Sequence, residues 1–184
     1  MHPTATELFA ETIEKTGRWI DEHGAVERTE VQGIALAHTA LDAREVVHHC
    51  RELFERGFSF EHAIKWILVD FWCESDLNTL RLHLAEVAGA QIAPNETWAM
   101  RVDRHGWQRY RTPQIVTHLA RAIDRCVALD HPDKLVRVDI VGERAAVSVL
   151  RPDDIFSSAA TGDLKRVSPP GEGGEPEKPR LQTS

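Results

Sequence analysis

The chain has 184 residues, enough for one large domain or two small ones. Its 22 Lys and Arg residues against 29 Asp and Glu residues give a net charge of −7, which taken alone argues against a nucleic-acid binder, because phosphate contacts need a basic surface. Apolar residues make up 42% of the chain, and no apolar run approaches the roughly 18 residues of a membrane span. We therefore expect a folded protein with no membrane contact.

The charge is unevenly distributed along the chain. Residues 1–96 hold eight basic and 17 acidic side chains, a net charge of −9. Residues 97–125 hold six arginines against two aspartates, a net charge of +4. The objection to nucleic-acid binding therefore applies to the first half of the chain and not to the basic segment that follows it.

The cysteines and the N-terminus indicate the compartment. Cys50, Cys73 and Cys126 are an odd number at wide spacing, which suits a reducing cytoplasm better than a disulfide framework. The first residues show no basic stretch followed by an apolar one, so we expect no secretion signal. The expected localisation is cytoplasmic.

The first half of the chain predicts alternating helices and strands. In chain order we expect an amphipathic helix over residues 4–23, a strand-like segment over 26–39 with a turn at Gly33, a helix over 43–56 between Asp42 and Gly57, a buried strand over 64–72, and a helix over 77–89 capped by Asp76. The turn at Ala93-Pro94-Asn95 follows this last helix and predicts a domain boundary.

The second half predicts a shorter series of elements. We expect a strand over 97–104, a polar, aromatic and basic loop over 105–111, a helix over 113–129 with Thr112 as its N-cap, and a hairpin of strands 135–141 and 144–150 around Gly142. From residue 158 the chain is rich in Pro, Gly and Glu, which predicts a disordered tail.

This order of elements indicates the fold class. Strands that alternate with helices are typical of α/β or α+β layers and not of a helix bundle or a β-sandwich. We predict three regions: an N-terminal α/β module over residues 1–93, a second domain over 94–157 and a tail over 158–184.

The second domain resembles a THUMP domain. The resemblance is carried by the strand W98-A-M-R-V-D-R-H-G106, the basic loop ending at Arg111-Thr112, the helix start P-Q-I-V, the segment L129-D-H-P-D133, and the hairpin V136-R-V-D-I-V-G-E143 and A146-V-S-V-L150. Upstream, residues 24–47 and 66–76 resemble the ferredoxin-like module that precedes THUMP in the adaptors of tRNA cytidine acetylation, the Tan1-like family.

The resemblance implies a function. THUMP domains bind tRNA near the acceptor stem and its single-stranded 3′ end and deliver a modifying enzyme to it. In the Tan1-like family the catalytic centre lies in a separate domain or chain. The expected protein is thus a non-catalytic adaptor that needs no cofactor and works with a separate tRNA-modifying enzyme.

The arginine-rich segment 101–111 has the chemistry expected of an RNA contact. Arginine offers a planar fork to phosphate oxygens, and an aromatic ring that stacks on an unpaired base contributes about 1–3 kcal/mol. The predicted contacts are Arg101, Arg104, His105, Trp107, Arg109, Tyr110 and Arg111. The alternative is that the arginines form a solvated strand face and the two aromatic side chains pack at an edge.

The following helix adds further candidates. Thr112 starts it, and free backbone N–H groups at a helix start can hold a phosphate. Arg121 and Arg125 lie four residues apart on one helical face, as a second phosphate track or as an ordinary solvent-facing pair. Arg144 in the hairpin turn is a weaker candidate, and alternation places Arg137 at the surface.

Metal binding and catalysis find little support in the sequence. His48 and His49 are adjacent on a helix and point about 100° apart, so they do not chelate together, and Cys50 is expected in the core. No zinc, nucleotide-binding or nucleophile motif is present. Two alternatives remain open: an RNA-modifying enzyme subunit with a site around residues 72–76 or the loop at His105, and a protein-interaction module that no longer binds RNA.

Overall fold

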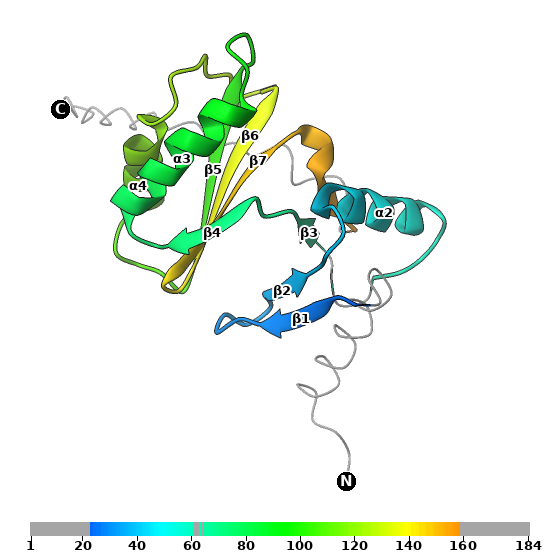
Figure 1. Ribbon diagram of the computed structural model, residues 1–184. Helices are drawn as coiled ribbons and strands as arrows, with labels where there is room; N and C mark the ends of the chain where they lie inside the picture. Colours follow the sequence, from blue (N-terminus) through cyan, green and yellow to red (C-terminus); the bar gives the residue numbers. More distant parts are fainter. Residues whose placement is uncertain (1–22, 61–62, 64, 159–184) are drawn as a thin grey trace, which may run out of the picture.

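The computed structural model describes residues 23–60, 63 and 65–158 (Figure 1). The helix predicted over residues 4–23 lies outside the described residues except for His23, and the predicted tail lies outside them except for Ser158. The strand predicted over 64–72 lies within them except for residue 64, and the remaining predictions for secondary structure fall on described residues.

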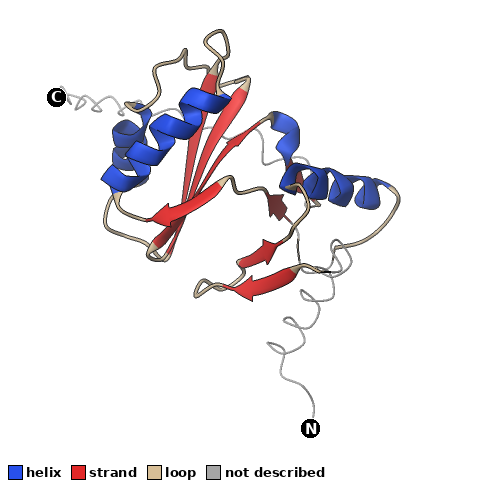
Figure 2. Cartoon of the chain, in the orientation of Figure 1, coloured by secondary structure: helices blue, strands red, loops and turns tan. Residues whose placement is uncertain are grey.

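Helices and strands alternate along the described chain (Figure 2). The helices are α2 (Ala43–Glu55), α3 (Leu77–Gln91), α4 (Thr112–Ala120) and the 3₁₀ helix η1 (Pro152–Asp154). The strands are β1 (Ala25–Arg28), β2 (Ala35–His38), β3 (Lys65–Ile67), β4 (Phe71–Glu74), β5 (Trp98–His105), β6 (Lys134–Val141), β7 (Arg144–Leu150) and β8 (Ile155–Ser157). The mixed α+β fold class expected from the sequence is confirmed.

A four-stranded sheet in the order β4-β7-β6-β5 organises the molecule. β5 and β6 run parallel, and the other two pairs are antiparallel. Helices α3 and α4 cover the same face of this sheet (Figure 1). The buried core between them is formed by Leu80 and Leu84 of α3, Ile115 and Leu119 of α4, and Val136, Val138, Ile140, Val147 and Val149 of the strands.

A second, smaller core joins α2 to the sheet β3-β8. Its buried members are Val47, Cys50, Phe60, Leu68, Leu150 and Phe156. These residues come from both halves of the chain, and β4 and α3 of the first half belong to the larger core. The predicted boundary at residue 93 therefore falls inside the layer that α3 and α4 form on the four-stranded sheet, and not between the two cores.

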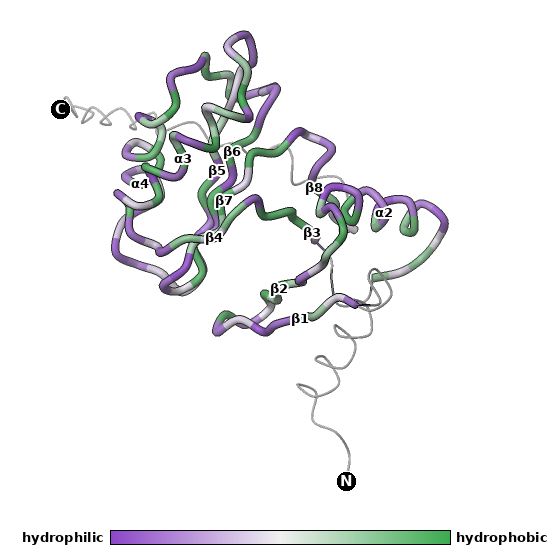
Figure 3. The backbone as a smooth tube through the Cα atoms, in the orientation of Figure 1, coloured by the Kyte–Doolittle hydropathy of each residue, from purple (hydrophilic) through white to green (hydrophobic). Residues whose placement is uncertain are grey.

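Hydropathy follows this arrangement. Figure 3 shows hydrophobic residues interspersed with hydrophilic ones along β4 to β7, and hydrophilic residues along much of α2. Burial of these apolar strands provides the main favourable free energy of folding. Within the described ranges, no helix is long and apolar enough to cross a membrane.

Asp42 and Asp76 start their helices as predicted. Asp42 Oδ1 accepts hydrogen bonds from the backbone N–H groups of Arg44 and Glu45, at 2.7 and 3.3 Å. Asp76 Oδ1 accepts from the N–H groups of Asn78 and Thr79, both at 3.0 Å. Each carboxylate thereby satisfies donors that a helix start would otherwise leave unpaired.

The single strand predicted over 64–72 is wrong. The segment divides into β3 and β4, which belong to different sheets, with a break at residues 68–70. Asp70 lies in this break, and its carboxylate accepts a 2.7 Å hydrogen bond from Val149 N–H. The apolar pattern hides the break, because the polar side chain at its end is satisfied by distant partners, Val149 and Arg44.

The helix predicted over 113–129 ends early. α4 begins at Thr112, with Arg111 and not Thr112 as its N-cap, and ends at Ala120. Beyond it, Cys126 C=O accepts from Trp98 N–H at 3.0 Å, and Ala128 N–H donates to Trp98 C=O at 2.9 Å. Since these residues pair with the edge of β5, they do not continue the helix.

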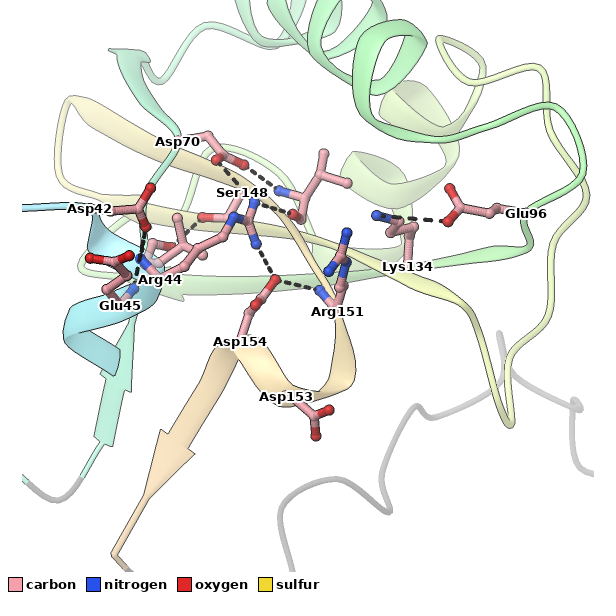
Figure 4. Close-up of polar contacts among 12 residues, drawn as sticks. Asp42, Arg44, Glu45, Asp70, Glu96, Lys134, Ser148, Arg151, Asp153 and Asp154 are labelled. Carbon is pink, nitrogen blue, oxygen red and sulfur yellow. Dashed lines mark hydrogen bonds and ion pairs between the residues drawn. The ribbon is translucent and has the colours of Figure 1, made fainter. Parts of the chain in front are cut away.

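A salt-bridge network joins α2 to the larger sheet (Figure 4). The Arg44 guanidinium pairs with Asp154 of η1, lies 3.6 Å from Asp70 Oδ1, and donates to Val149 C=O at 3.3 Å. Asp154 also accepts from Arg151 N–H at 2.8 Å. One arginine therefore fixes the chain's return from β7 to β8 against the start of α2.

Candidate nucleic-acid interface

Three connecting segments meet at one end of the four-stranded sheet. They are residues 75–76 between β4 and α3, residues 106–111 between β5 and α4, and residues 142–144 at the start of β7. Ser75 N–H donates to Glu143 C=O at 2.9 Å, and Gly142 N–H donates to His105 C=O at 3.2 Å. We refer to these three segments as the loop end.

Arg104 shapes the longest of these segments. Its Nε donates to Thr112 Oγ1 at 3.1 Å, and its Nη1 donates to Tyr110 C=O at 2.7 Å. Gly106 has φ +73°, and a Cβ added there would lie 3.8 Å from Val31 Cγ2 in the turn between β1 and β2. The predicted contact residues Arg104 and Thr112 thus bind each other and hold the loop in place.

Arg109 and Arg111 are exposed, and neither forms an ion pair with any described residue. The pKa of Asp76 is lowered by the hydrogen bonds from Thr79 and Asn78 and also by the positive charge of Arg109. Arg109 therefore lies close enough to the start of α3 to affect the carboxylate electrostatically. These two side chains remain available to an anionic ligand.

The start of α4 offers fewer donors than the sequence suggests. Pro113 has no N–H, and the Arg111 N–H donates to Gln114 Oε1 at 2.9 Å. The Gln114 N–H donates in turn to Arg111 C=O at 3.0 Å. The first turn thus satisfies much of its own hydrogen bonding, and the exposed arginines next to it are the stronger candidates for phosphate contact.

The two aromatic side chains of the loop have different environments. Trp107 is only 7% exposed and packs in the core between the sheet and its helices. Tyr110 is 47% exposed, and its ring centroid lies 5.8 Å from that of Trp107. Trp107 is therefore a core residue and cannot stack on an RNA base in this conformation, whereas Tyr110 can.

Arg101 and His105 lie on β5 within a network of charged side chains. Arg101 Nε donates to Asp103 Oδ2 at 3.1 Å, and His105 Nε2 lies 3.5 Å from Asp139 Oδ1. Arg101 and His105, both predicted to contact RNA, thus have acidic partners within the protein itself.

Arg137 occupies the centre of this network and is 4% exposed, so its predicted surface position is wrong. Its Nη2 lies 2.6 Å from Asp103 Oδ2, and its Nε lies 2.5 Å from Asp139 Oδ2. Two carboxylates on neighbouring strands offset the cost of burying its charge. Alternation along β6 correctly places Arg137 opposite the helices, but it does not reveal that this position is covered.

Arg121 and Arg125 do not form the predicted pair on one helix. Arg121 is the exposed C-cap residue of α4, and Arg125 lies beyond the helix. Arg125 Nε donates to Ile92 C=O at 3.3 Å, and its Nη1 donates to Asp124 C=O at 2.7 Å. Arg125 therefore ties the loop after α4 to the end of α3.

Sequence reasoning gave little weight to Arg144, which the structure places at the loop end. Arg144 is exposed at the start of β7, and its guanidinium carbon lies 4.8 Å from the ring centroid of Trp72 on β4. The pairing of these strands puts Trp72 opposite Ala146, two residues from Arg144. Only strand register reveals this neighbour, because 72 residues separate the two side chains in the sequence.

The cysteine and histidine predictions can also be placed. Cys50 is fully buried as expected, and burial raises the pKa of its thiol to about 11. His48 and His49 both lie within 4 Å of Glu52 on the surface of α2, at 3.4 and 3.8 Å. Across the described ranges, no group of three or more His, Cys, Asp or Glu residues is placed to hold a metal ion.

Comparison with known proteins gives structural similarity alone. No protein-family model matches the sequence, and no curated protein matches it significantly. PH1313 from Pyrococcus horikoshii superimposes with a TM-score of 0.57 and 12% identity, over 86% of this chain and 53% of that chain. A 4-thiouridine synthetase, solved in complex with RNA and ATP, superimposes with a TM-score of 0.55 and 12% identity, over 85% of this chain and 39% of that chain.

These similarities support the fold expected from the sequence. Both superpositions extend over most of this chain, and they show a shared fold. The chain spans about half of PH1313 and about two fifths of the synthetase. At 12% identity the likeness shows the fold alone, which for this chain is a mixed α+β structure.

Proposed function

We propose that the protein binds tRNA through the loop end and acts as a non-catalytic adaptor that presents the acceptor end to a separate tRNA-modifying enzyme. The observation that carries the proposal is that Arg109 and Arg111 lie there, exposed and without an ion pair to a described residue. Arginine side chains that are not committed to internal carboxylates are the ones that can bind phosphate.

The acceptor end offers what this surface can bind. Its stem presents phosphates to the arginines, and its unpaired 3′ nucleotides present bases to the exposed Tyr110 ring. A synthetase with a similar fold was solved in complex with RNA, and this similarity supports the proposal that the present protein binds RNA. Only a few phosphates are within reach of such a surface, so we expect modest affinity.

The adaptor role rests on the acidic first half of the chain. Glu45 and Glu55 are exposed on α2, which lies away from the loop end (Figure 1). An acidic surface accelerates encounter with a basic enzyme through complementary fields. The three cysteines are free thiols, which supports a protein of the reducing cytoplasm.

The test is binding of whole tRNA and of tRNA trimmed of its 3′ end, measured over a series of salt concentrations. For a protein that contacts several phosphates, the logarithm of the binding constant falls linearly with the logarithm of the salt concentration. We expect whole tRNA to bind more tightly than trimmed tRNA, with a measurable salt dependence for both. Equal, weak binding to any polyanion would contradict the proposal.

An enzyme role has one observation in its favour. The hydrogen bonds of Ser75 and Gly142 bring residues 72–76 and His105 to the same end of the sheet, although the sequence separates them. Analysis of tRNA nucleosides from a deletion strain distinguishes the two functions. If this chain alone restores a lost modification in vitro, it is the enzyme; if restoration needs a second protein, it is the adaptor.

A further inference from the structure

Trp72 is a large aromatic residue that belongs to neither hydrophobic core of the described chain. Its neighbours on β4, Phe71 and Cys73, pack against the core under α3. Because successive side chains of a strand point to opposite faces, Trp72 lies on the face that α3 does not cover. It is half-buried there, beside the small Ala146 that pairs with it on β7.

Arg144 lies over this ring. The distance from its guanidinium carbon to the ring centroid is 4.8 Å, within the range of a cation–π contact. Glu74 is its register partner on β4, yet the two form no ion pair, and neither does Arg144 with any other described residue. The guanidinium thus contacts the Trp72 ring, and its N–H donors form no ion pair with a described residue.

This pair adjoins the proposed RNA surface. The backbone C=O of Glu143, the residue before Arg144, accepts the hydrogen bond from Ser75 N–H. Asp76 follows Ser75, and the positive charge of Arg109 contributes to lowering its pKa. Arg144 thus belongs to the same loop end as Arg109 and Arg111. It also supplies the stacking surface that the buried Trp107 does not.

We propose that Trp72 and Arg144 form a stacking subsite for an unpaired nucleobase of the RNA bound at the loop end. The base lies on the outer face of the Arg144 guanidinium, and Trp72 supports that guanidinium from below. This inference rests on the proposed RNA binding and adds the place where a base is held. Stacking of a base on a guanidinium plane is a recurrent mode of single-strand recognition and tolerates any base.

Ordering of the side chain before binding contributes to the subsite. A free arginine loses rotamer entropy when it binds, and this loss weakens affinity. The Trp72 ring already restricts Arg144, so less entropy remains to be lost. The subsite therefore requires both residues, and removal of either weakens stacking.

The experiment compares an RNA hairpin that has a single-stranded 3′ overhang with the same hairpin made blunt. The variants are Trp72→Leu, which keeps apolar bulk, and Arg144→Lys, which keeps the charge without the planar group. We expect each variant to weaken overhang binding by roughly 5- to 150-fold, the range that loss of one stacked base produces. Affinity for the blunt hairpin should change less than about twofold, because its phosphate contacts remain.

A fluorescent base analogue reports stacking directly. With 2-aminopurine in the overhang, the wild-type protein should quench the emission, and Arg144→Lys should restore most of it. Arg56→Ala, an exposed arginine on α2 that lies 3.9 Å from Glu52, serves as the matched control and should behave as the wild type. Arg144 is exposed, so its variant reports on stacking even if Trp72→Leu folds poorly.

The possible outcomes separate the two proposals. If the wild-type protein binds neither hairpin, the proposed function is wrong and the subsite with it. If the wild type binds both hairpins and the two variants bind them equally well with unchanged quenching, RNA binding stands and the subsite is wrong. An equal loss for overhang and blunt hairpins would also overturn the subsite, because it would show a phosphate contact.

Discussion

Arg104 donates a 3.1 Å hydrogen bond from Nε to the hydroxyl oxygen of Thr112, and so connects the end of β5 to the first residue of α4. The same guanidinium donates to Tyr110 C=O at 2.7 Å. The segment between them, which carries Arg109 and Arg111, is therefore held at both of its ends. One arginine of the loop positions the two that remain available for RNA.

Arg104→Ala should loosen this segment. We expect the free energy of unfolding to fall by about 1 kcal/mol, the usual net contribution of such hydrogen bonds, and tRNA affinity to fall because Arg109 and Arg111 lose their fixed positions. Urea denaturation and a binding titration measure the two effects. Arg56→Ala, at the exposed arginine that follows α2, is the control. Unchanged affinity for tRNA in Arg104→Ala would contradict the positioning role.

Arg109→Glu combined with Arg111→Glu should abolish tRNA binding without unfolding the protein. Both side chains are exposed, so the fold does not depend on them, whereas four units of charge change at the proposed phosphate site. Circular dichroism checks the fold and filter binding checks the affinity. Arg56→Glu reverses one charge on α2 and should leave affinity nearly unchanged. A folded double variant that binds tRNA normally would refute the assignment of the loop.

Substitutions at Trp107 distinguish core packing from RNA contact. Trp107→Ala should destabilise the protein by about 3–5 kcal/mol, as removal of a buried large aromatic side chain does. Trp107→Phe should cost much less, because the indole N–H that it removes has no hydrogen-bond partner among the described residues. Chemical denaturation tests the order of these effects. A folded Trp107→Phe variant should bind tRNA as the wild type does; a large loss would return Trp107 to the binding surface.

The N-cap of α3 makes stability sensitive to acid. Hydrogen bonds from Thr79 and Asn78 and the charge of Arg109 lower the pKa of Asp76 below its ordinary value of 3.8. A carboxylate with a lowered folded-state pKa stabilises the protein above the unfolded-state pKa, and that stabilisation is lost as pH falls through the folded-state pKa. Asp76→Asn keeps the cap and removes the titration. As the pH is lowered from about 4 to 2, the midpoint of unfolding of the wild type should therefore fall more steeply than that of Asp76→Asn. Parallel dependences of the two midpoints on pH would contradict this prediction.

Local signals predict the starts of α2 and α3. Asp42 and Asp76 cap α2 and α3 by bonding to N–H groups two and three residues ahead, which depends on neighbouring residues alone. The break at Asp70 and the end of α4 at Ala120 have no such local signal. Both depend on distant partners, since Asp70 is satisfied by Val149 and the residues after α4 pair with Trp98. Periodicity within a segment carries no information about such partners.

The sequence alone determined the α+β class, the caps of α2 and α3, and a basic segment in an acidic chain, because composition, capping and alternation act over a few residues. Tertiary structure decided which side chains of that segment are available. It buried Trp107 in a core, committed Arg104 to Thr112, and brought Arg144 of β7 to the same end as Arg109. The reason is physical: alternation gives the face on which a side chain lies, but burial and pairing depend on what packs against that face from elsewhere in the chain.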